Sequence, residues 1–453
     1  MRILLISSNV AESPYAVFPL GMSMVAAALE RRGHEVTLLD FLAAGQSLDA
    51  VREAVRTARP ELIGLSIRNI DNVNLLNTKG YLAAARDIVT ALRAVTDVRI
   101  VVGGSGFSVM PEAVLATVGA DYGVAGEGEQ AFADFADEAS QGRYPAARIL
   151  YAPPRLKGAA IPPARYDPAL LAHYLKRGGM APVQTKRGCT HSCVYCTYPL
   201  LEGRAIRERE PAAVVDDLES LASQHQARQI FFTDSVFNDD GGCYRALVQE
   251  MRRRAFHLPW TAFFAPSAEL DDAIVADMHA TGLRAAELGS DAATDTTLKG
   301  MGKGFTFCDV EACNDLFLRH DVATAHYFMF GGPGETPATV VEGIANIRRL
   351  KHTAVFVFMG IRILPDTPLA RLAECEGLCQ PGQSLLEAIY YISPGVDRDW
   401  MERQLNEGFA GQRHIVFPPD KLDGKLQFLY QLGFTGSLVE MLAGPKAPPA
   451  HGK

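Results

Sequence analysis

Three cysteines share one short stretch, Cys189-Thr190-His191-Ser192-Cys193-Val194-Tyr195-Cys196, which follows a strand expected at residues 182–186. Their spacing is C-x3-C-x2-C, and three thiolates this close on one loop can bind one metal centre. An iron–sulfur cubane held by three protein thiolates keeps one iron open, whereas structural zinc usually takes four protein ligands. The spacing therefore favours a 4Fe-4S cluster on Cys189, Cys193 and Cys196.

Other uses of the cysteines stay open at this point. His191 could serve as a fourth ligand and complete a zinc site, or the three thiols could simply be buried. Among the 8 cysteines of the chain, Cys375 and Cys379 share a C-x3-C spacing but lack a third partner. The remaining thiols are expected to be buried small apolar groups, namely Cys243, Cys308 and Cys313.

Downstream of residue 181, short apolar runs alternate with helical stretches. The expected strands are residues 182–186, 229–233, 260–264, 285–288, 325–330 and 355–363. Six strands spaced by helices predict a partial (β/α)6 barrel over residues 181–375, with functional groups at the C-terminal ends of the strands. Residues 376–453 are expected to form a small helical extension with a frayed tail at residues 444–453.

The first 150 residues show the same alternation. Strands are expected at residues 2–7, 35–39, 62–67 and 98–102, with helices at 20–32 and 81–95. This rhythm predicts an α/β domain of the doubly wound, Rossmann type, which binds ligands at the carboxyl ends of its strands. Ser66, Gly103, Gly104 and Gly106 lie there. Five prolines between residues 151 and 180 predict an extended linker: Pro153, Pro154, Pro162, Pro163 and Pro168.

The charge and the hydropathy of the chain limit the kinds of molecule that it can bind. The 453 residues carry 44 Lys and Arg against 52 Asp and Glu, a net charge of −8. Nucleic-acid backbones are bound through Lys and Arg, so we expect no nucleic acid as a main partner but a small molecule, which could be cationic. No apolar run is long enough for a membrane span, and the N-terminus is too short and strand-like for a signal peptide, so we expect a cytoplasmic protein away from membranes.

The cysteine motif at the end of a barrel strand resembles that of the radical SAM superfamily. In that family the open iron chelates S-adenosylmethionine, and one electron from flavodoxin or a similar donor cleaves it to a 5′-deoxyadenosyl radical. The resemblance implies contact with the adenine by Tyr195, with the methionine part by Asp234 and Ser235, and with the ribose by Asp291, which replaces the family's Glu. Further cofactor-binding residues would be Lys303, Gly331, Gly332 and Arg362.

The chain also resembles the branch with an N-terminal cobalamin-binding-like domain, through Pro19-Leu20-Gly21, Gly103-Gly104 and Gly126-Glu127-Gly128-Glu129. Residues 8–21 contain no histidine to coordinate cobalt. The D-x-H-x-x-G pattern at residues 277–282 lies in a stretch expected to be a barrel helix, so we treat it as a coincidence. The run Arg68-Asn69-Ile70-Asp71-Asn72 could fill the corrin site, bind substrate, or form a loop with an Arg68–Asp71 pair. We therefore expect a degenerate domain without cobalamin.

Three functions compete. The chain resembles the radical SAM diol dehydratases of aminoglycoside (apramycin) biosynthesis, which implies hydrogen abstraction from paromamine, C3′ deoxygenation, and a separate NADPH-dependent dehydrogenase for the product. Carboxylates for such a cationic sugar are Asp71, Asp234, Asp239 and Glu287, of which the last three are also catalytic candidates. The alternative is a cobalamin-dependent radical SAM methyltransferase of a natural-product pathway. The third reading is a scaffold protein with a structural cluster.

Overall fold

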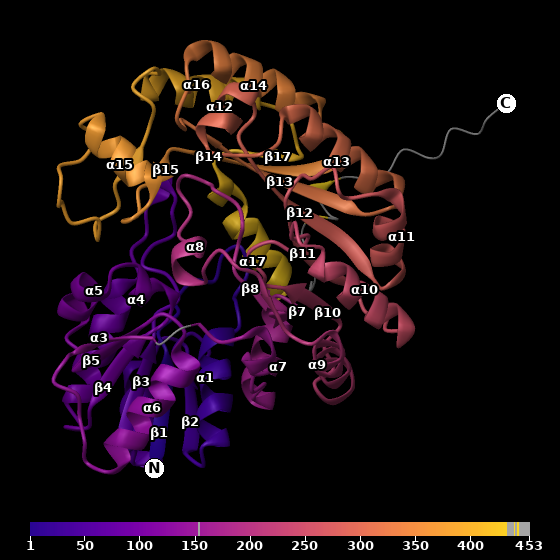
Figure 1. Ribbon diagram of the computed structural model, residues 1–453. Helices are drawn as coiled ribbons and strands as arrows, with labels where there is room; N and C mark the ends of the chain where they lie inside the picture. Colours follow the sequence, from indigo (N-terminus) through magenta and orange to yellow (C-terminus); the bar gives the residue numbers. More distant parts are fainter. Residues whose placement is uncertain (153–154, 433–438, 440–441, 444–453) are drawn as a thin grey trace.

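The computed structural model describes residues 1–152, 155–432, 439 and 442–443, which form two α/β domains with a C-terminal helix, α17, between them (Figure 1). The N-terminal domain holds a six-stranded parallel sheet in the order β2-β1-β3-β4-β5-β6. Its strands are β1 (Arg2–Ser7), β2 (Glu35–Asp40), β3 (Leu62–Ser66), β4 (Ile100–Gly103), β5 (Tyr122–Ala125) and β6 (Ile149–Tyr151). This confirms the doubly wound sheet.

Helices cover both faces of this sheet because its strands are apolar on both faces. Leu4 and Ile6 pack with α2, α3 and α5, whereas Ile3 and Leu5 pack with α1 and α6. The sequence did not indicate β5 and β6, which have only four and three residues. The helices are α1 (Leu20–Arg31), α2 (Leu48–Ala58), α3 (Leu82–Arg93), α4 (Ser105–Val109), α5 (Pro111–Val118) and α6 (Gly128–Ser140).

The stretch expected to be an extended linker is partly helical. Residues 168–177 form α7 (Pro168–Arg177), which begins where the Asp167 carboxylate accepts from Leu170 N at 2.9 Å. Leu171 and Tyr174 are buried against the second domain, and the Tyr174 hydroxyl donates to Asp40 Oδ1 at 2.9 Å. The helix therefore joins the two domains. Pro153 and Pro154 lie outside the described residues.

The second domain is a partial barrel of seven parallel strands in the order β17-β14-β13-β12-β11-β10-β7. The six strands expected from the sequence are present, and the C-terminal extension adds the seventh. That strand, β17, has only two residues, too few to form a sequence pattern. The strands are β7 (Met180–Val183), β10 (Gln229–Phe232), β11 (Trp260–Phe264), β12 (Leu283–Asp291), β13 (Ala323–Phe330), β14 (Thr353–Met359) and β17 (Ile415–Val416).

Helices line the outside of the barrel (Figure 1). Val439 packs on Ala285, Ala325 and Ala354, three small side chains of neighbouring strands. The frayed tail expected at residues 444–453 lies outside the described residues. The barrel helices are α9 (Pro211–Gln224), α10 (Cys243–Arg253), α11 (Asp272–Ala280), α12 (Asp295–Gly300), α13 (Phe307–Arg319) and α14 (Pro337–Arg349), followed by α15 (Pro368–Cys375), α16 (Arg398–Gly408) and α17 (Asp423–Gln431).

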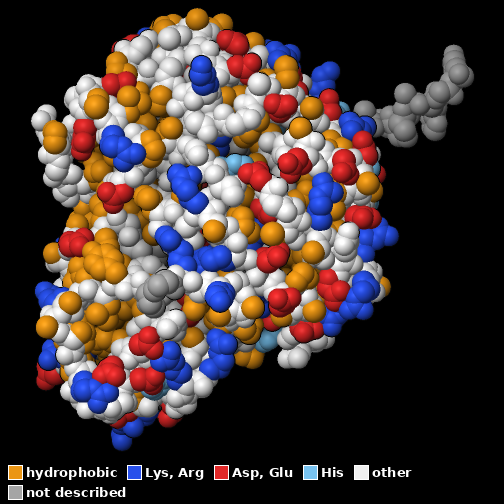
Figure 2. Space-filling model, viewed as in Figure 1, with side chains coloured by type: hydrophobic (Ala, Val, Ile, Leu, Met, Phe, Trp, Pro, Cys, Tyr) orange, Lys and Arg blue, Asp and Glu red, His pale blue; other side chains and the backbone are white. Residues whose placement is uncertain are grey.

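The apolar length of the helices and the distribution of surface charge bear on what the protein can bind. Within the described part of the chain, no helix is both long and apolar enough to cross a lipid bilayer. Figure 2 shows acidic and basic side chains interspersed over one face of both domains.

Candidate functional site

The three cysteines lie on a loop whose two ends are joined by a short antiparallel ladder of β8 (Lys186–Arg187) and β9 (Arg207–Glu208). Just inside the ladder, Cys189 N donates to Gly203 O at 3.0 Å. Gly188 has a φ of +100°, and a Cβ there would lie 2.2 Å from a backbone oxygen across the loop. Glycine is therefore required at this turn. The ladder presents the cysteines as one compact loop after β7.

The three cysteine thiols differ in burial, and none of them is in a disulfide. All three are free; Cys189 is buried, and Cys193 and Cys196 are half-buried. Among the described residues, no three His, Cys, Asp or Glu side chains are grouped as a site for one metal ion. A cubane makes a different demand, because each cysteine binds a different iron. Burial raises the pKa of the Cys196 thiol to about 12, and binding to iron would replace that proton.

Asp291 ends strand β12 beside this loop. Its carboxylate accepts from the Tyr195 hydroxyl at 2.5 Å and forms an ion pair with Lys303. Lys303 Nζ also donates to Cys193 Sγ at 3.1 Å. Burial alone would lower the pKa of Lys303, but the charges of Asp291 and Cys193 outweigh burial and raise it. Three residues expected at the cofactor, Tyr195, Asp291 and Lys303, thus lie together at the cysteine loop.

A distortion of β12 aims the Asp291 carboxylate. The register with β13 shifts between Leu288 and Asp291, and Asp291 has a φ of +60°. In this bulge the Ser290 hydroxyl bonds His326 Nδ1 at 2.8 Å, and both side chains are buried. Burial lowers the pKa of His326 to about 3, so the ring is neutral. The neutral pair holds the bulge without placing a charge in the core.

The glycine turn after β13 packs against the same region. Gly331 has a φ of +91°, and its N–H donates to Glu335 Oε2 at 3.1 Å. A Cβ on Gly332 would lie 2.9 Å from the Met301 sulfur, and Met301 O accepts from Val194 N, inside the cysteine loop, at 3.1 Å. On the other side, the Ser235 hydroxyl donates to Gly188 O at 2.9 Å. These residues border the loop, and their contact with a cofactor stays a prediction.

The inside of the barrel carries an arc of aromatic rings around one buried carboxyl group. The Phe263 ring centroid lies 5.7 Å from that of Phe231 and 5.9 Å from that of Tyr327, which stacks on Phe356 at 5.3 Å. The Tyr327 hydroxyl donates to Glu287 Oε2 at 2.8 Å. Burial raises the pKa of Glu287 to about 7. Phe263 remains 36% exposed, whereas Tyr327 and Phe356 are partly buried and pack against the cluster that includes Val439.

The carboxyl edge of the N-terminal sheet faces the barrel (Figure 1). Arg68, Asn69 and Ser105 are exposed there, although the strands that precede them are buried. The Ser105 hydroxyl donates to Arg68 O at 2.7 Å, so the loops after β3 and β4 lie side by side. Sheets of this type bind their ligands at this edge.

Two family models match these two domains. Residues 6–136 match the B12 binding domain, and residues 183–347 match the radical SAM superfamily. The chain therefore carries a B12-binding domain and a radical SAM domain, and the cysteine loop lies in the radical SAM domain.

Similar proteins share both domains. A tryptophan 2-C-methyltransferase of Streptomyces laurentii is 27% identical over 454 residues, which cover 83% of this chain and 75% of that protein. The structure of the radical S-adenosylmethionine methyltransferase TsrM from Kitasatospora setae, with tryptophan substrate and a SAM analogue bound, aligns with a TM-score of 0.86 at 26% identity. The alignment covers 98% of this chain and 97% of that one. OxsB, a cobalamin-dependent radical enzyme at 14% identity and a TM-score of 0.72, shares the fold.

These findings overturn the expectation of a domain without cobalamin. The match to the B12-binding model is joined by a TsrM structure with cobalamin and a 4Fe-4S cluster bound, with a TM-score of 0.84 and coverage of 97% of each chain. The bulky run after β3 was one ground for expecting a domain without cobalamin. Arg68 and Asn69 are exposed, and Asp71 turns to Arg362 and pairs with it, not with Arg68. Arg68 and Asn69 are therefore not packed into the domain, and Asp71 is used in a contact with the other domain.

The D-x-H-x-x-G pattern lies far from this edge. Asp277 and His279 are on α11, a helix on the outside of the radical SAM barrel, and Asp277 pairs with Arg252 of α10. Gly282 follows with a φ of +114°, where a Cβ would lie 2.2 Å from Leu258 O. The expected barrel helix is thus present, and the glycine serves the turn into β12.

Two carboxylates expected near the substrate face a buried lysine. Asp234 accepts from Thr185 N at 2.7 Å and from Lys186 N at 3.2 Å, and burial raises its pKa. Lys186 Nζ lies 2.8 Å from Asp239 Oδ1 and 4.0 Å from Asp234 Oδ2. Asp239 also caps α10 by accepting from Cys243 N at 3.1 Å. Both carboxylates thus bind residues at the start of the cysteine loop and connect that loop to the end of β10.

Arg362, expected at the cofactor, has other partners in the structure. Its Nε lies 2.8 Å from Asp71 Oδ2 across the domain boundary, and its other nitrogens donate to Ile363 O and Leu385 O, each at 2.6 Å. The isolated cysteines were all expected to be buried, and the structure buries only some of them. Cys313 is buried as expected, whereas Cys308 is exposed and Cys243 is half-buried. No sequence pattern near these residues distinguishes them.

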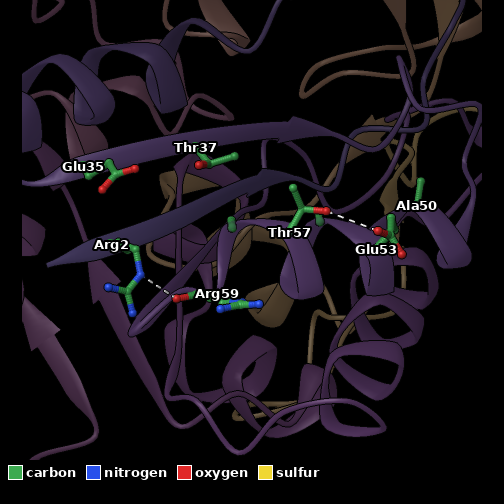
Figure 3. A pocket seen from close by; sticks show the side chains of 9 residues that line it. Arg2, Glu35, Thr37, Ala50, Glu53, Thr57 and Arg59 are labelled. Carbon is green, nitrogen blue, oxygen red and sulfur yellow. Dashed lines mark hydrogen bonds between the residues drawn. The ribbon is translucent and has the colours of Figure 1, made fainter.

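A surface cavity lies away from this site. It measures about 880 Å³ and lies between α2 and the N-terminal ends of β1 and β2, where Arg2 donates to Arg59 O at 2.9 Å (Figure 3). Ligands of such sheets bind at the opposite, carboxyl edge. We assign this cavity no part in the reaction.

Proposed function

We propose that this radical SAM enzyme transfers a methyl group from S-adenosylmethionine to a carbon atom of a small aromatic substrate, with cobalamin as second cofactor. The observation that carries the proposal is the aromatic arc around Glu287, in a chain similar to a tryptophan methyltransferase over both domains. Aromatic side chains stack with a planar substrate in offset or edge-to-face geometry. The arc lies in the barrel that carries the cysteine loop.

Different residues of the chain would bind the different cofactors and the substrate. Cys189, Cys193 and Cys196 would hold the cluster, and the carboxyl edge near Arg68 would hold cobalamin, which carries a methyl group when bound. Tyr195, Asp291 and Lys303 would hold S-adenosylmethionine beside the cluster. Methylation of an aromatic carbon replaces C–H by C–CH3 and releases one proton. Glu287, with a pKa of about 7 and Tyr327 as its donor, is suited to accept that proton at neutral pH.

Dehydration of a cationic sugar has less support. Of the four carboxylates expected to bind its ammonium groups, three already face a buried cation: Asp71 with Arg362, and Asp234 and Asp239 with Lys186. The Streptomyces laurentii relative and TsrM are methyltransferases rather than dehydratases. A dehydrogenase partner therefore has no place in the proposal, whereas an electron donor remains an expectation.

One anaerobic assay separates the two reactions. Protein reconstituted with iron, sulfide and cobalamin is incubated with S-adenosylmethionine and a reductant, first with tryptophan and other aromatic amino acids and then with paromamine. We expect an aromatic product heavier by one CH2 group, together with S-adenosylhomocysteine. A product of paromamine lighter by one water, with no methylated aromatic product, would overturn the proposal.

A further inference from the structure

The neck of the cysteine loop is formed by two arginines. Arg187 on β8 and Arg207 on β9 are paired across the antiparallel ladder, so one lies at each end of the loop. Arg187 precedes Cys189 by two residues. A contact that fixes these two side chains therefore also fixes the orientation of the loop that carries all three cysteines.

Both arginines bind the same turn of the B12-binding domain. Glu127 and Glu129 follow β5, at the carboxyl edge of the sheet. Arg207 makes two hydrogen bonds to Glu127, at 3.1 Å to Oε2 and 2.5 Å to Oε1. Arg187 forms an ion pair with Glu129 and lies 3.5 Å from Glu127 Oε2. The motif Gly126-Glu127-Gly128-Glu129, noted in the sequence without a function, thus contacts the other domain.

The four charges are balanced and nearly excluded from water. The side chains of Arg187, Glu127 and Glu129 are 7%, 9% and 7% exposed, and that of Arg207 is 12% exposed. Burial alone would raise the pKa of Glu127, but the hydrogen bond from Arg207 and the charge of Arg187 outweigh it and lower the pKa. Buried ions with several charge-assisted hydrogen bonds have well-defined geometry. Such a network resists rotation of one domain against the other.

A second buried ion pair joins the same domains from another strand. Asp71 follows β3, and Arg362 lies on β15 (Ile361–Arg362) at the exit of β14. In the sheet, β4 lies between β3 and β5, so the two contacts lie on either side of the β4 exit at the carboxyl edge. A single contact would act as a pivot, whereas two separated contacts fix an orientation.

We propose that Glu127, Glu129, Arg187 and Arg207 form an interdomain clasp that positions the cysteine loop against the carboxyl edge of the B12-binding domain. These are positioning residues and touch no substrate. The clasp sets the separation of the cluster from the cobalamin edge. This inference goes beyond the proposed function, because it holds whichever reaction follows.

The test measures that separation in the holoenzyme. A reduced 4Fe-4S cluster and cob(II)alamin are both paramagnetic, so their magnetic coupling in electron paramagnetic resonance reports their distance. The Glu127→Gln/Glu129→Gln variant keeps the shape of the side chains and removes both negative charges. Asp217→Asn is the matched control, because Asp217 forms an ion pair at 2.7 Å with Arg209, also an arginine with little exposure, inside the radical SAM domain.

We expect wild type and Asp217→Asn to show one narrow coupling, and the double variant to show a broad distribution with full iron and cobalamin content. Its kcat should fall about tenfold or more with KM within about twofold, since misplaced reacting groups slow the step without weakening binding. An unchanged coupling, or loss of the cluster, would overturn the proposal; the latter would mean that the glutamates only hold the loop. If the double variant does not fold, Glu129→Gln, which keeps Glu127 with both arginines, is expected to show a smaller broadening. Failure of the methylation assay would leave the coupling measurement intact.

Discussion

Arg362 and Asp71 form a buried ion pair between the radical SAM domain and the B12-binding domain, with 2.8 Å between Nε and Oδ2 and side-chain exposures of 2% and 5%. Nearly three hundred residues separate the two in the sequence, so only the folded chain brings them together. The sequence placed Arg362 at the cofactor and Asp71 at the substrate, and both roles stay predictions.

Asp71→Asn should destabilise the protein by about 3–5 kcal/mol, because it leaves the Arg362 charge buried without its partner. Urea unfolding of the purified protein measures the shift. The control is Glu311→Gln, which breaks the exposed Arg349–Glu311 pair and should cost about 1 kcal/mol or less. Equal shifts for the two variants would contradict a buried interdomain contact.

Cys193→Ala should abolish the brown colour, the bound iron and all cleavage of S-adenosylmethionine, because two thiolates cannot hold a cubane that needs three. Iron content and the visible spectrum after anaerobic reconstitution are the measurements. Cys308→Ala, at an exposed thiol on α13, should retain all three properties. Full iron content in Cys193→Ala would rule out the cluster assignment.

Glu287→Gln should change how stability depends on pH. The pKa of Glu287 is about 7 in the folded protein and 4.5 in its ordinary state. Folding therefore favours the protonated form: this contribution is fully present below about pH 4.5 and is lost as the pH rises to about 7. The loss amounts to about 3 kcal/mol.

The measurement compares urea unfolding of wild type and Glu287→Gln across this range, and the variant should lack that part of the pH dependence. Tyr327→Phe is the second variant. It removes the hydrogen bond that lowers the pKa of Glu287, so the loss of stability should extend to higher pH. Parallel curves for wild type and Glu287→Gln would show that Glu287 does not titrate near pH 7.

His279→Ala should leave the cobalamin content unchanged, because His279 lies on α11, outside the barrel and away from the carboxyl edge of the B12-binding domain. Absorbance of the corrinoid after reconstitution and desalting measures this. His257→Ala, also outside the barrel, serves as the comparison. A loss of cobalamin in His279→Ala alone would mean that the D-x-H-x-x-G pattern is functional.

Short-range patterns predicted much of the architecture. The aliphatic run at residues 2–7 and the strands up to residue 363 are visible because their core side chains are neighbours in the chain. The cysteine spacing predicted the cluster loop for the same reason. The sequence motifs also indicate Tyr195, Asp291 and Lys303, and the structure brings these residues together, although their contacts with a cofactor are still a prediction.

The sequence by itself determined the two α/β domains, the helices between their strands and the loop with three cysteines, because periodicity and spacing act over a few residues. Only the tertiary structure decided which charged groups are free. Asp71, Asp234 and Arg362 look alike as candidates in the sequence, yet each is paired inside the protein, since burying an unpaired charge is costly. For the same reason Glu127 and Glu129 are paired with Arg187 and Arg207, partners from distant segments that no local pattern reveals.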